Sequence, residues 1–232
     1  MYKNQIDKYG IILQENSFKR LTKKFEQNPH VKVYWNHRQL HVTVTSKAVP
    51  IPDTLNYVTI EDIQKHSDII FNSSGYCIPY EEILYSQLFW VDIKKDVENT
   101  TGYSNKNVIS VLREKSYKNT TKNETPSFDK GKGFENSLVV TSTCKKVKDS
   151  ICVYEKIPEI INNRWNDPDY YKNFTKDFLI KNTNTLRFER RLQSSRDIKK
   201  AFKLENLKVV TLSDIFNSDV DVVSEKVQKI FM

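Results

Sequence analysis

Glycine and cysteine are scarce in this sequence, and their scarcity excludes several kinds of site. Only 5 of the 232 residues are glycine, and none of the glycine-rich motifs that bind nucleotide phosphates is present. The cysteines Cys77, Cys144 and Cys152 cannot form a closed set of disulfides, and none has the C-x-x-C spacing of a zinc or redox site. We therefore expect a protein of a reducing cell interior whose chemistry does not require ATP.

The sequence also lacks a long apolar run and an excess of acidic residues. No run reaches the roughly 18 apolar residues of a membrane span, and the start, MYKNQIDKYGIIL, has no apolar stretch of signal-peptide length. Lysine and arginine number 37 against 29 aspartate and glutamate, a formal charge of +8. Because the basic residues lie between strand-like runs and not along one amphipathic helix, nucleic acid is favoured over a membrane as the partner. A soluble protein that is merely basic is the alternative.

The N-terminal third has the pattern of mixed α and β structure, and 38% hydrophobic residues suffice for a core. The apolar spacing predicts a short strand at Tyr9–Leu13 and a helix at Phe18–Gln27. The runs VKVYW and LHVTVT flank a polar turn, as in an antiparallel hairpin. A capping residue and two early acids predict a further helix at Thr59–Phe71.

The middle of the chain combines one buried strand with a long irregular segment. Tyr80–Tyr85 predicts one or two helical turns, and the run LFWVDI predicts a buried strand with Asp92 near its end. Asp96 is a weaker candidate for any site, because the strand is expected to end before it. Residues 98–134 surround one weak helix at Val108–Arg113 with Asn, Thr, Lys and Ser, so we interpret them as a long surface insertion.

The rest of the chain predicts a hairpin, a strand and a helical tail. Two strand-like runs flank a lysine-rich turn in Asn136–Glu159, a helical stretch follows at Asp169–Ile180, and TLRFERRL predicts a strand at Thr185–Leu192. We therefore predict an α+β fold with a mainly antiparallel sheet and flanking helices. Residues 1–195 would form the main domain, and residues 196–232 a short helical C-terminal appendage.

The second strand of the hairpin leads into the spacing Y-x-K-x-x-E, formed by Tyr154, Lys156 and Glu159. A tyrosine hydroxyl has an unperturbed pKa of about 10, so as a nucleophile it needs a nearby cation or metal. On one strand, Lys156 would share a face with Tyr154. The pair is suited to attack on a phosphodiester, which leaves a phosphotyrosine link and a free 3′ hydroxyl. A strand tyrosine with its hydroxyl in solvent is the alternative.

Three carboxylates, Asp92, Glu159 and Glu189, are candidates for a metal site. Mg²⁺ and Mn²⁺ prefer oxygen ligands, and a few carboxylates suffice for a catalytic ion. Asp92 follows an apolar run, where an unpaired charge would be costly. Glu189 alternates with Arg187 and Arg191 on one face of its strand. For Glu189, a structural carboxylate–arginine pair fits the sequence as well as metal ligation does.

Basic and aromatic residues are candidates for contacts with DNA. Tyr34, Trp35 and Trp90 could stack with bases of melted DNA, with a core position as the alternative. His41 lacks a second histidine one residue away, so a hydrogen-bonded strand histidine is favoured over a metal ligand. The basic candidates for phosphate contacts, with a solvated turn as the alternative for the lysines, are Lys145, Lys146, Lys148, Arg187, Arg190 and Arg191.

The order of VDIKKD, ICVYEKIPE, TLRFERRL, SRDIKK and TLSDIF resembles the replication initiation proteins of small plasmids and filamentous phages. These are the phage gene II/gene X type and the related plasmid rolling-circle initiators. The resemblance spans roughly residues 88–216. It implies a metal-dependent, site-specific single-strand endonuclease and strand transferase that nicks the plus-strand origin.

By motif position, the resemblance implies a role for four residues. Tyr154 matches the nucleophile, Asp92 and Glu159 match acidic metal-site residues, and Glu189 matches the carboxylate of the later R-x-E strand. It further implies Mg²⁺ or Mn²⁺ as cofactor and origin DNA, single-stranded or hairpin, as substrate, in the cytoplasm of a bacterial host. A homodimer, a host helicase and a host polymerase are the candidate protein partners.

Two further hypotheses come from other classes. One is a non-catalytic DNA-binding protein that acts in replication or copy control. The other is an unrelated basic structural protein of a virus or mobile element. Formation of a covalent protein–DNA adduct separates the initiator from both.

Overall fold

The chain forms two compact units, each built from segments that are distant in the sequence. The computed structural model describes all residues except 1–3, 21–27, 37, 120–123, 128–136 and 143–146. The first unit contains Met1–Pro50, Asn56–Ile93 and Leu192–Val220, and the second contains Ile51–Leu55, Lys94–Arg191 and Asp221–Met232. The predicted division at residue 195 stays a prediction, and the helices beyond it are shared between the two units.

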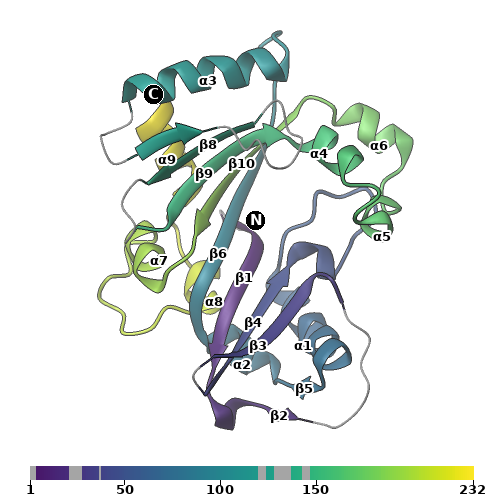
Figure 1. The fold of residues 1–232 in the computed structure, drawn as a ribbon, viewed down its shortest axis with the longest axis vertical. Helices are drawn as coiled ribbons and strands as arrows, with labels where there is room; N and C mark the ends of the chain where they lie inside the picture. The colour runs from purple at the N-terminus through teal and green to yellow at the C-terminus, as the bar shows by residue number, and fades with distance from the viewer. Residues whose placement is uncertain (1–3, 21–27, 37, 120–123, 128–136, 143–146) are drawn as a thin grey trace. The chain divides into compact units, whose positions relative to one another are not determined.

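The sheet of the first unit brings four strands side by side (Figure 1). Their order is β3 (Val31–Asn36), β4 (Gln39–Thr45), β1 (Gln5–Leu13) and β6 (Gln87–Glu98), of which β6 continues beyond this unit. β4 pairs antiparallel with both β3 and β1. Tyr9, Ile11 and Leu13 alternate along β1 and are fully buried, as expected for a strand with one face in the core. The predicted strand and hairpin are confirmed.

The helix α1 (Ile60–Ser74) packs on the buried face of this sheet. It begins with a capping box, because the Thr59 hydroxyl accepts from the Asp62 amide and the Asp62 carboxylate accepts from the Thr59 amide. One turn further in, His66 Nδ1 lies 2.9 Å from the Tyr9 hydroxyl of β1. The helix predicted in this region is confirmed.

Short elements complete the first unit. They are η1 (Glu15–Ser17), β2 (Lys19–Arg20), η2 (Ser46–Ala48), β5 (Tyr76–Cys77), α2 (Tyr80–Tyr85), α7 (Ser195–Ala201) and α8 (Leu212–Phe216). The helix predicted at Phe18–Gln27 is wrong at its start, because β2 pairs with β5 and this tertiary pairing outweighs the local helical pattern. Residues 21–27 of that prediction lie outside the described residues. α2 has the predicted bounds.

The sheet of the second unit begins with the remainder of β6. The strands that follow are β10 (Thr185–Leu192), β9 (Asp149–Glu155), β8 (Ser137–Ser142) and β7 (Glu124–Ser127). β8 pairs antiparallel with β9 and with β7. The predicted hairpin and the strand TLRFERRL are confirmed. The expectation that β6 ends before Asp96 is wrong, because the strand runs on to Glu98.

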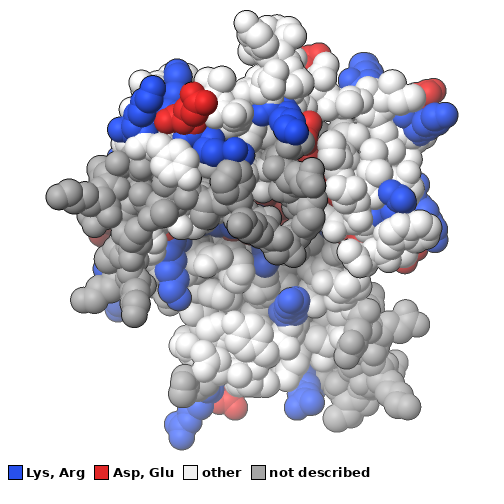
Figure 2. All heavy atoms as spheres, turned by 45° about the horizontal axis from the view of Figure 1, so that its top comes forward, with Lys and Arg blue, Asp and Glu red and all other residues white. Residues whose placement is uncertain are grey.

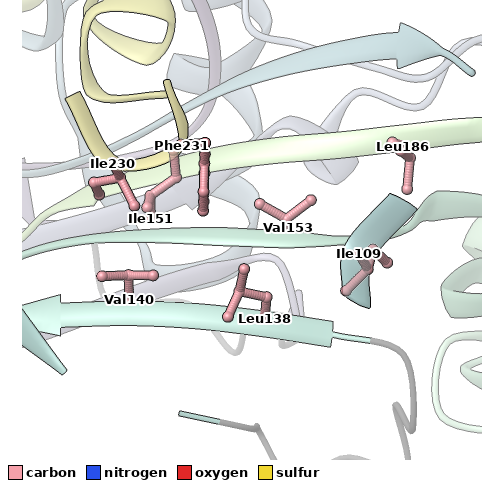
Figure 3. Packing of buried hydrophobic residues seen from close by; sticks show 8 residues of the cluster. All are labelled: Ile109, Leu138, Val140, Ile151, Val153, Leu186, Ile230 and Phe231. Atoms are coloured by element: carbon pink, nitrogen blue, oxygen red, sulfur yellow. The ribbon is translucent and has the colours of Figure 1, made fainter. Parts of the chain in front are cut away.

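The core of the second unit lies between its sheet and two helices, α3 (Asn105–Asn119) and α9 (Val222–Phe231). Figure 3 shows Ile109 of α3 and Phe231 of α9 among the side chains of β8, β9 and β10. Residues 98–134 were predicted as an insertion with one weak helix. They contain instead a 15-residue helix and a strand, because burial of Ile109 stabilises a segment of low helical propensity.

A second apolar cluster in this unit lies among three short helices, α4 (Lys156–Asn162), α5 (Pro168–Tyr171) and α6 (Lys176–Lys181). It contains Ile157, Ile160, Tyr170, Phe174 and Leu179. The single helical stretch predicted at Asp169–Ile180 is therefore two helices, α5 and α6.

The prediction of an α+β fold with a mainly antiparallel sheet and flanking helices is confirmed. Within the described part of the chain, no helix has the length and apolarity needed to cross a bilayer.

Candidate active site

The strand β9 places the Tyr154 hydroxyl against a carboxylate of the neighbouring strand β10. Tyr154 is the penultimate residue of β9 and lies opposite Ser137 of β8. Its hydroxyl donates a hydrogen bond of 2.8 Å to Glu189 Oε2. Tyr154 is partly exposed, so a ligand could reach it from solvent while Glu189 holds its hydroxyl. The structure thus brings together two of the predicted site residues, which lie 35 positions apart in the chain.

Glu189 is held from two sides. Its Oε2 accepts from Tyr154 and its Oε1 accepts from Arg191 Nε at 2.6 Å. The Glu189 side chain is only 6% exposed, while the Arg191 side chain is 33% exposed. The structural carboxylate–arginine pair considered from the sequence is therefore present. It also fixes the orientation of the oxygen that faces the phenol.

Lys156 is not on the strand of Tyr154, so the prediction that the two side chains share a strand face is wrong. β9 ends at Glu155, and Lys156 is the first residue of α4. Pro158 explains the change, since a proline in the first helical turn has no unsatisfied N–H and a φ suited to a helix. Lys156 is 2% exposed, and its Nζ lies 2.5 Å from Glu159 Oε2. The other oxygen of Glu159 accepts from Asn163 at 3.0 Å.

Asp96 also lies in this region, although the sequence predicted it only as a weaker candidate. Its two oxygens accept from Arg187 Nε and Nη2 at 2.6 and 2.7 Å. Burial by itself raises the pKa of Asp96, but the paired Arg187 and the nearby Lys94 and Lys156 outweigh burial and hold that pKa below its ordinary value. The alternation of Asp92, Lys94 and Asp96 along VDIKKD would have indicated Asp96 if the predicted strand had continued to that residue.

Asp92 belongs to the first unit, and its surroundings there are aromatic. It is buried, and its Oδ1 accepts from Trp90 Nε1 at 2.6 Å. The indole N–H of Trp90 is a neutral donor to this carboxylate. The structure therefore pairs Tyr154 with Glu189 and Lys156 with Glu159, and it places Asp92 beside Trp90.

The predicted metal ligands do not form a ready site. Among the described residues, no group of three or more His, Cys, Asp or Glu side chains is arranged to hold a metal ion. Both carboxylate oxygens of Glu189 and of Glu159 already accept hydrogen bonds from protein donors. A divalent ion would have to displace one of these donors at each acid, so the residues as arranged do not fit it. The requirement for Mg²⁺ or Mn²⁺ stays a prediction.

The predicted phosphate contacts fall into three groups. Lys145 and Lys146 lie outside the described residues, Lys148 is exposed, and Arg191 is partly exposed. Arg187 and Arg190 are buried in ion pairs with Asp96 and Asp149, so this placement does not support their contact with DNA. On the face shown in Figure 2, Lys and Arg side chains are more widely spread than Asp and Glu. Basic side chains other than those two arginines are therefore exposed on this face.

Arg190 instead fastens α9 to the sheet. Its Nε and Nη2 donate to Asp149 of β9 at 3.0 and 2.8 Å, and its Nη1 donates to the Val222 carbonyl of α9 at 2.8 Å. Lys226 of α9 lies 3.4 Å from the same aspartate. Burial raises the pKa of Asp149, but the bonds and charges of Arg190 and Lys226 lower it below its ordinary value overall.

Comparison with known proteins gives no family. No family model matches the chain, and no curated protein sequence matches it. Among solved structures, one similar chain is described as a rolling circle replication initiator protein from Geobacillus stearothermophilus. The match has 13% sequence identity and a TM-score of 0.36, and it covers 89% of this chain and 80% of that chain. A superposition at that score does not establish a common fold, so no residue role is transferred from it.

Proposed function

We propose that the protein is a replication initiator that nicks single-stranded or melted origin DNA with Tyr154 and thereby starts rolling-circle replication. The observation that carries the proposal is the hydrogen bond from the Tyr154 hydroxyl to the buried Glu189 carboxylate. A nucleophile bonded to a base that a third group orients is the usual arrangement of an activated side chain. Arg191 is that third group. The sequence motifs around these residues resemble those of replication initiation proteins, which supports the same function.

The proposed step is a transesterification. The Tyr154 oxygen forms a bond to the phosphorus, and the bond from that phosphorus to the 3′ oxygen breaks. The phenol proton passes to Glu189 Oε2, the departing 3′ oxygen takes a proton from water, and the hydroxide left behind takes the proton back from Glu189. A carboxylate is a weaker base than a phenolate, so proton transfer becomes favourable only as the bond to phosphorus forms. Glu189 therefore acts in the transition state.

The products explain the place of this step in replication. The 5′ phosphate stays on Tyr154 as a phosphotyrosine, and the free 3′ hydroxyl can prime a polymerase. The reaction exchanges one phosphodiester for another, so it consumes no nucleotide. Arg191 lies beside the carboxylate and is accessible enough to face a phosphate, which would offset part of the negative charge of the site.

The test is the covalent adduct. The full chain is incubated with a pool of random-sequence single-stranded DNA and with Mg²⁺, Mn²⁺ or a chelator, and adducts are separated under denaturing conditions. We expect an adduct with the wild type and none with Tyr154→Phe. Tyr103→Phe, which alters an exposed tyrosine of the same unit, is the matched control and should behave as wild type. Adduct formation by Tyr154→Phe would assign the nucleophile to another residue.

A non-catalytic DNA-binding role in replication or copy control is the second candidate. It is favoured by one observation: the acids predicted as metal ligands are engaged by protein donors in the described structure. This candidate predicts that the wild type shifts DNA in a native gel yet forms no adduct with either metal. The chelator lane also tests the metal requirement, which stays part of the initiator proposal.

A further inference from the structure

The first unit carries a row of aromatic side chains on the sheet face opposite α1. Tyr34 of β3 and His41 of β4 are directly opposite each other in the register, and their rings are stacked with centroids 5.1 Å apart. His41 in turn meets the Phe89 ring of β6 edge to face at 5.0 Å. The inner side of the Tyr34 ring is therefore covered by His41, while the side chain remains 48% exposed. A flat ring is left facing outward.

Gly10 allows this row to cross β1. A Cβ on Gly10 would lie 2.8 Å from Phe89 Cζ, closer than packed atoms approach, and 3.2 Å from Trp90 Cβ, which is a tight contact. The absence of a side chain thus lets Phe89 lie over the strand, next to Trp90. Burial lowers the pKa of His41 below its ordinary value, so at neutral pH its ring is an uncharged part of the row.

Two lysine side chains lie on the same side of the sheet as these aromatic rings. Lys8 Nζ lies over the Trp90 ring, 3.8 Å from its centroid, and Lys32 is exposed two residues before Tyr34 on the same side of β3. The acid on this side, Asp92, is buried and accepts from Trp90. The sequence from Gln27 to Pro52 contains no acidic residue. The exposed part of this surface is therefore aromatic and basic.

We propose that this aromatic surface, formed by Tyr34, His41, Phe89 and Trp90 with Lys8 and Lys32, binds unpaired nucleotides of single-stranded DNA. A base would stack on the outer side of Tyr34, and the two lysines would lie near the flanking phosphates. Duplex DNA fits less well, because its bases already stack on each other. The choice of DNA over RNA rests on the proposed function. Trp35 is not included, because it points to the other side of β3, where its Nε1 donates to the Tyr76 hydroxyl.

The test measures binding of fluorescein-labelled oligothymidylate to the full chain by fluorescence anisotropy. Stacking of one base on an aromatic side chain contributes about 1–3 kcal/mol, so Tyr34→Ala should weaken binding by about 5- to 150-fold. Tyr34→Phe keeps the ring and should remain within about threefold of the wild type. A matched control is Tyr85→Ala, which removes an exposed tyrosine of α2 in the same unit and should change nothing. Melting temperatures of the variants check that each is folded.

Several outcomes would overturn the inference. Equal affinity of Tyr34→Ala and wild type would exclude stacking on Tyr34. Equal loss in Tyr34→Phe and Tyr34→Ala would assign the contact to the hydroxyl. Competition by a base-free polyphosphate as effective as that by oligothymidylate, at equal charge, would reduce the surface to a polyanion site. Tighter binding of oligouridylate than of oligothymidylate would make RNA the ligand.

The inference and the proposed function can fail separately. Tyr154→Phe should bind oligothymidylate as the wild type does while forming no adduct. If the wild type forms no adduct but Tyr34→Ala still loses affinity, the aromatic surface stands and nicking does not. If adducts form at the wild-type rate and affinity with Tyr34→Ala, nicking stands and the surface does not.

Discussion

The two units differ in the buried cations that they contain. Among the described residues, every buried lysine and arginine belongs to the second unit: Lys94, Lys156, Arg187, Arg190 and Lys226. The first unit buries instead the pair of Tyr9 and His66, in which His66 has its pKa lowered from 6.5 to about 4. Burial lowers it most, and Asp62 partly opposes that effect. At neutral pH this pair carries no charge.

The difference indicates what each unit is built to do. A buried cation loses its hydration and is tolerated only with acids or carbonyls around it, which a stable core does not otherwise need. The second unit supplies such partners in Asp96, Asp149 and Glu159. Its interior can therefore hold charges at fixed positions, as reaction chemistry requires. The charged residues that the first unit buries, among those described, are the acids Asp62, Asp92 and Asp197, and its aromatic surface suits binding.

Glu189→Gln is expected to have the largest effect and would localise the chemistry to the second unit. Glutamine can still accept a hydrogen bond from Tyr154 but cannot take its proton. Loss of a general base lowers rates by about 10²- to 10⁴-fold, so single-turnover adduct formation should slow by that factor. Binding of oligothymidylate should not change. Glu98→Gln, at the exposed end of β6, is the control. An unchanged rate in Glu189→Gln would remove the carboxylate from the mechanism.

Arg190→Met should have the next largest effect, and on stability. The change leaves Asp149 with Lys226 alone and removes the donor to the Val222 carbonyl. Breaking a buried ion pair from one side costs about 3–5 kcal/mol, to be measured by urea unfolding. Lys181→Met, an exposed cation of the same unit, should cost less than about 0.5 kcal/mol. A small loss in Arg190→Met would mean that the buried ions of this unit contribute little to folding.

The pH dependence of unfolding should separate the two units. His66 stays neutral in the folded state down to about pH 4, whereas unfolded histidine binds a proton below about 6.5. The unfolded state therefore gains protons first, and the free energy of unfolding should fall by about 3 kcal/mol between these two pH values. His66→Gln should lack this part of the pH dependence. A wild-type curve that is flat from pH 7 to pH 4 would contradict the neutral pair.

Asp96 and Asp149 should act at lower pH. Their folded pKa values lie below the ordinary value of 3.8, so the stability that they contribute is present above that pH. It is lost as the pH falls through the lowered folded values. Asp149→Asn should weaken the loss below pH 3.8 and leave the His66 step unchanged. Urea unfolding of both variants at pH 7, 4.5 and 3 distinguishes the two steps.

Tyr9→Phe should have the smallest effect of the series. It removes one hydroxyl and leaves His66 Nδ1 buried without a partner, at a cost of about 1–2 kcal/mol. Because the Tyr9–His66 pair is uncharged, this loss should be smaller than that for Arg190→Met. Both values come from the same urea measurement. Similar losses of unfolding free energy in the two variants would mean that the neutral pair and the buried ion pair contribute equally to stability.

Much of the fold could be predicted because its signals are local. The cap at Thr59, the hairpin of β8 and β9 and the alternation in TLRFERRL each depend on a few neighbouring residues. The misses depend on distant contacts. β2 forms because it pairs with β5, and α3 is stabilised by the burial of Ile109. A short sequence window contains neither partner.

The candidate site was predictable in its residues but not in its pairing. Motif order pointed to Tyr154 and Glu189, while their hydrogen bond depends on the sheet order that puts β10 beside β9. Lys156 was misplaced because the strand alternation was continued to Lys156, where a helix begins. Asp96 was missed because it follows two adjacent lysines, and a run of charged residues resembles a loop.

The position of Tyr154 between a strand and a helix bears on how a cut strand would be passed on. β9 fixes the backbone before it, and α4 begins two residues after it. A DNA end joined to this residue could therefore move only by rotation about the bonds of one side chain and of its ester link to phosphorus. In the proposed cycle the backbone around Tyr154 would not move, and the acceptor DNA end would have to approach the phosphotyrosine link.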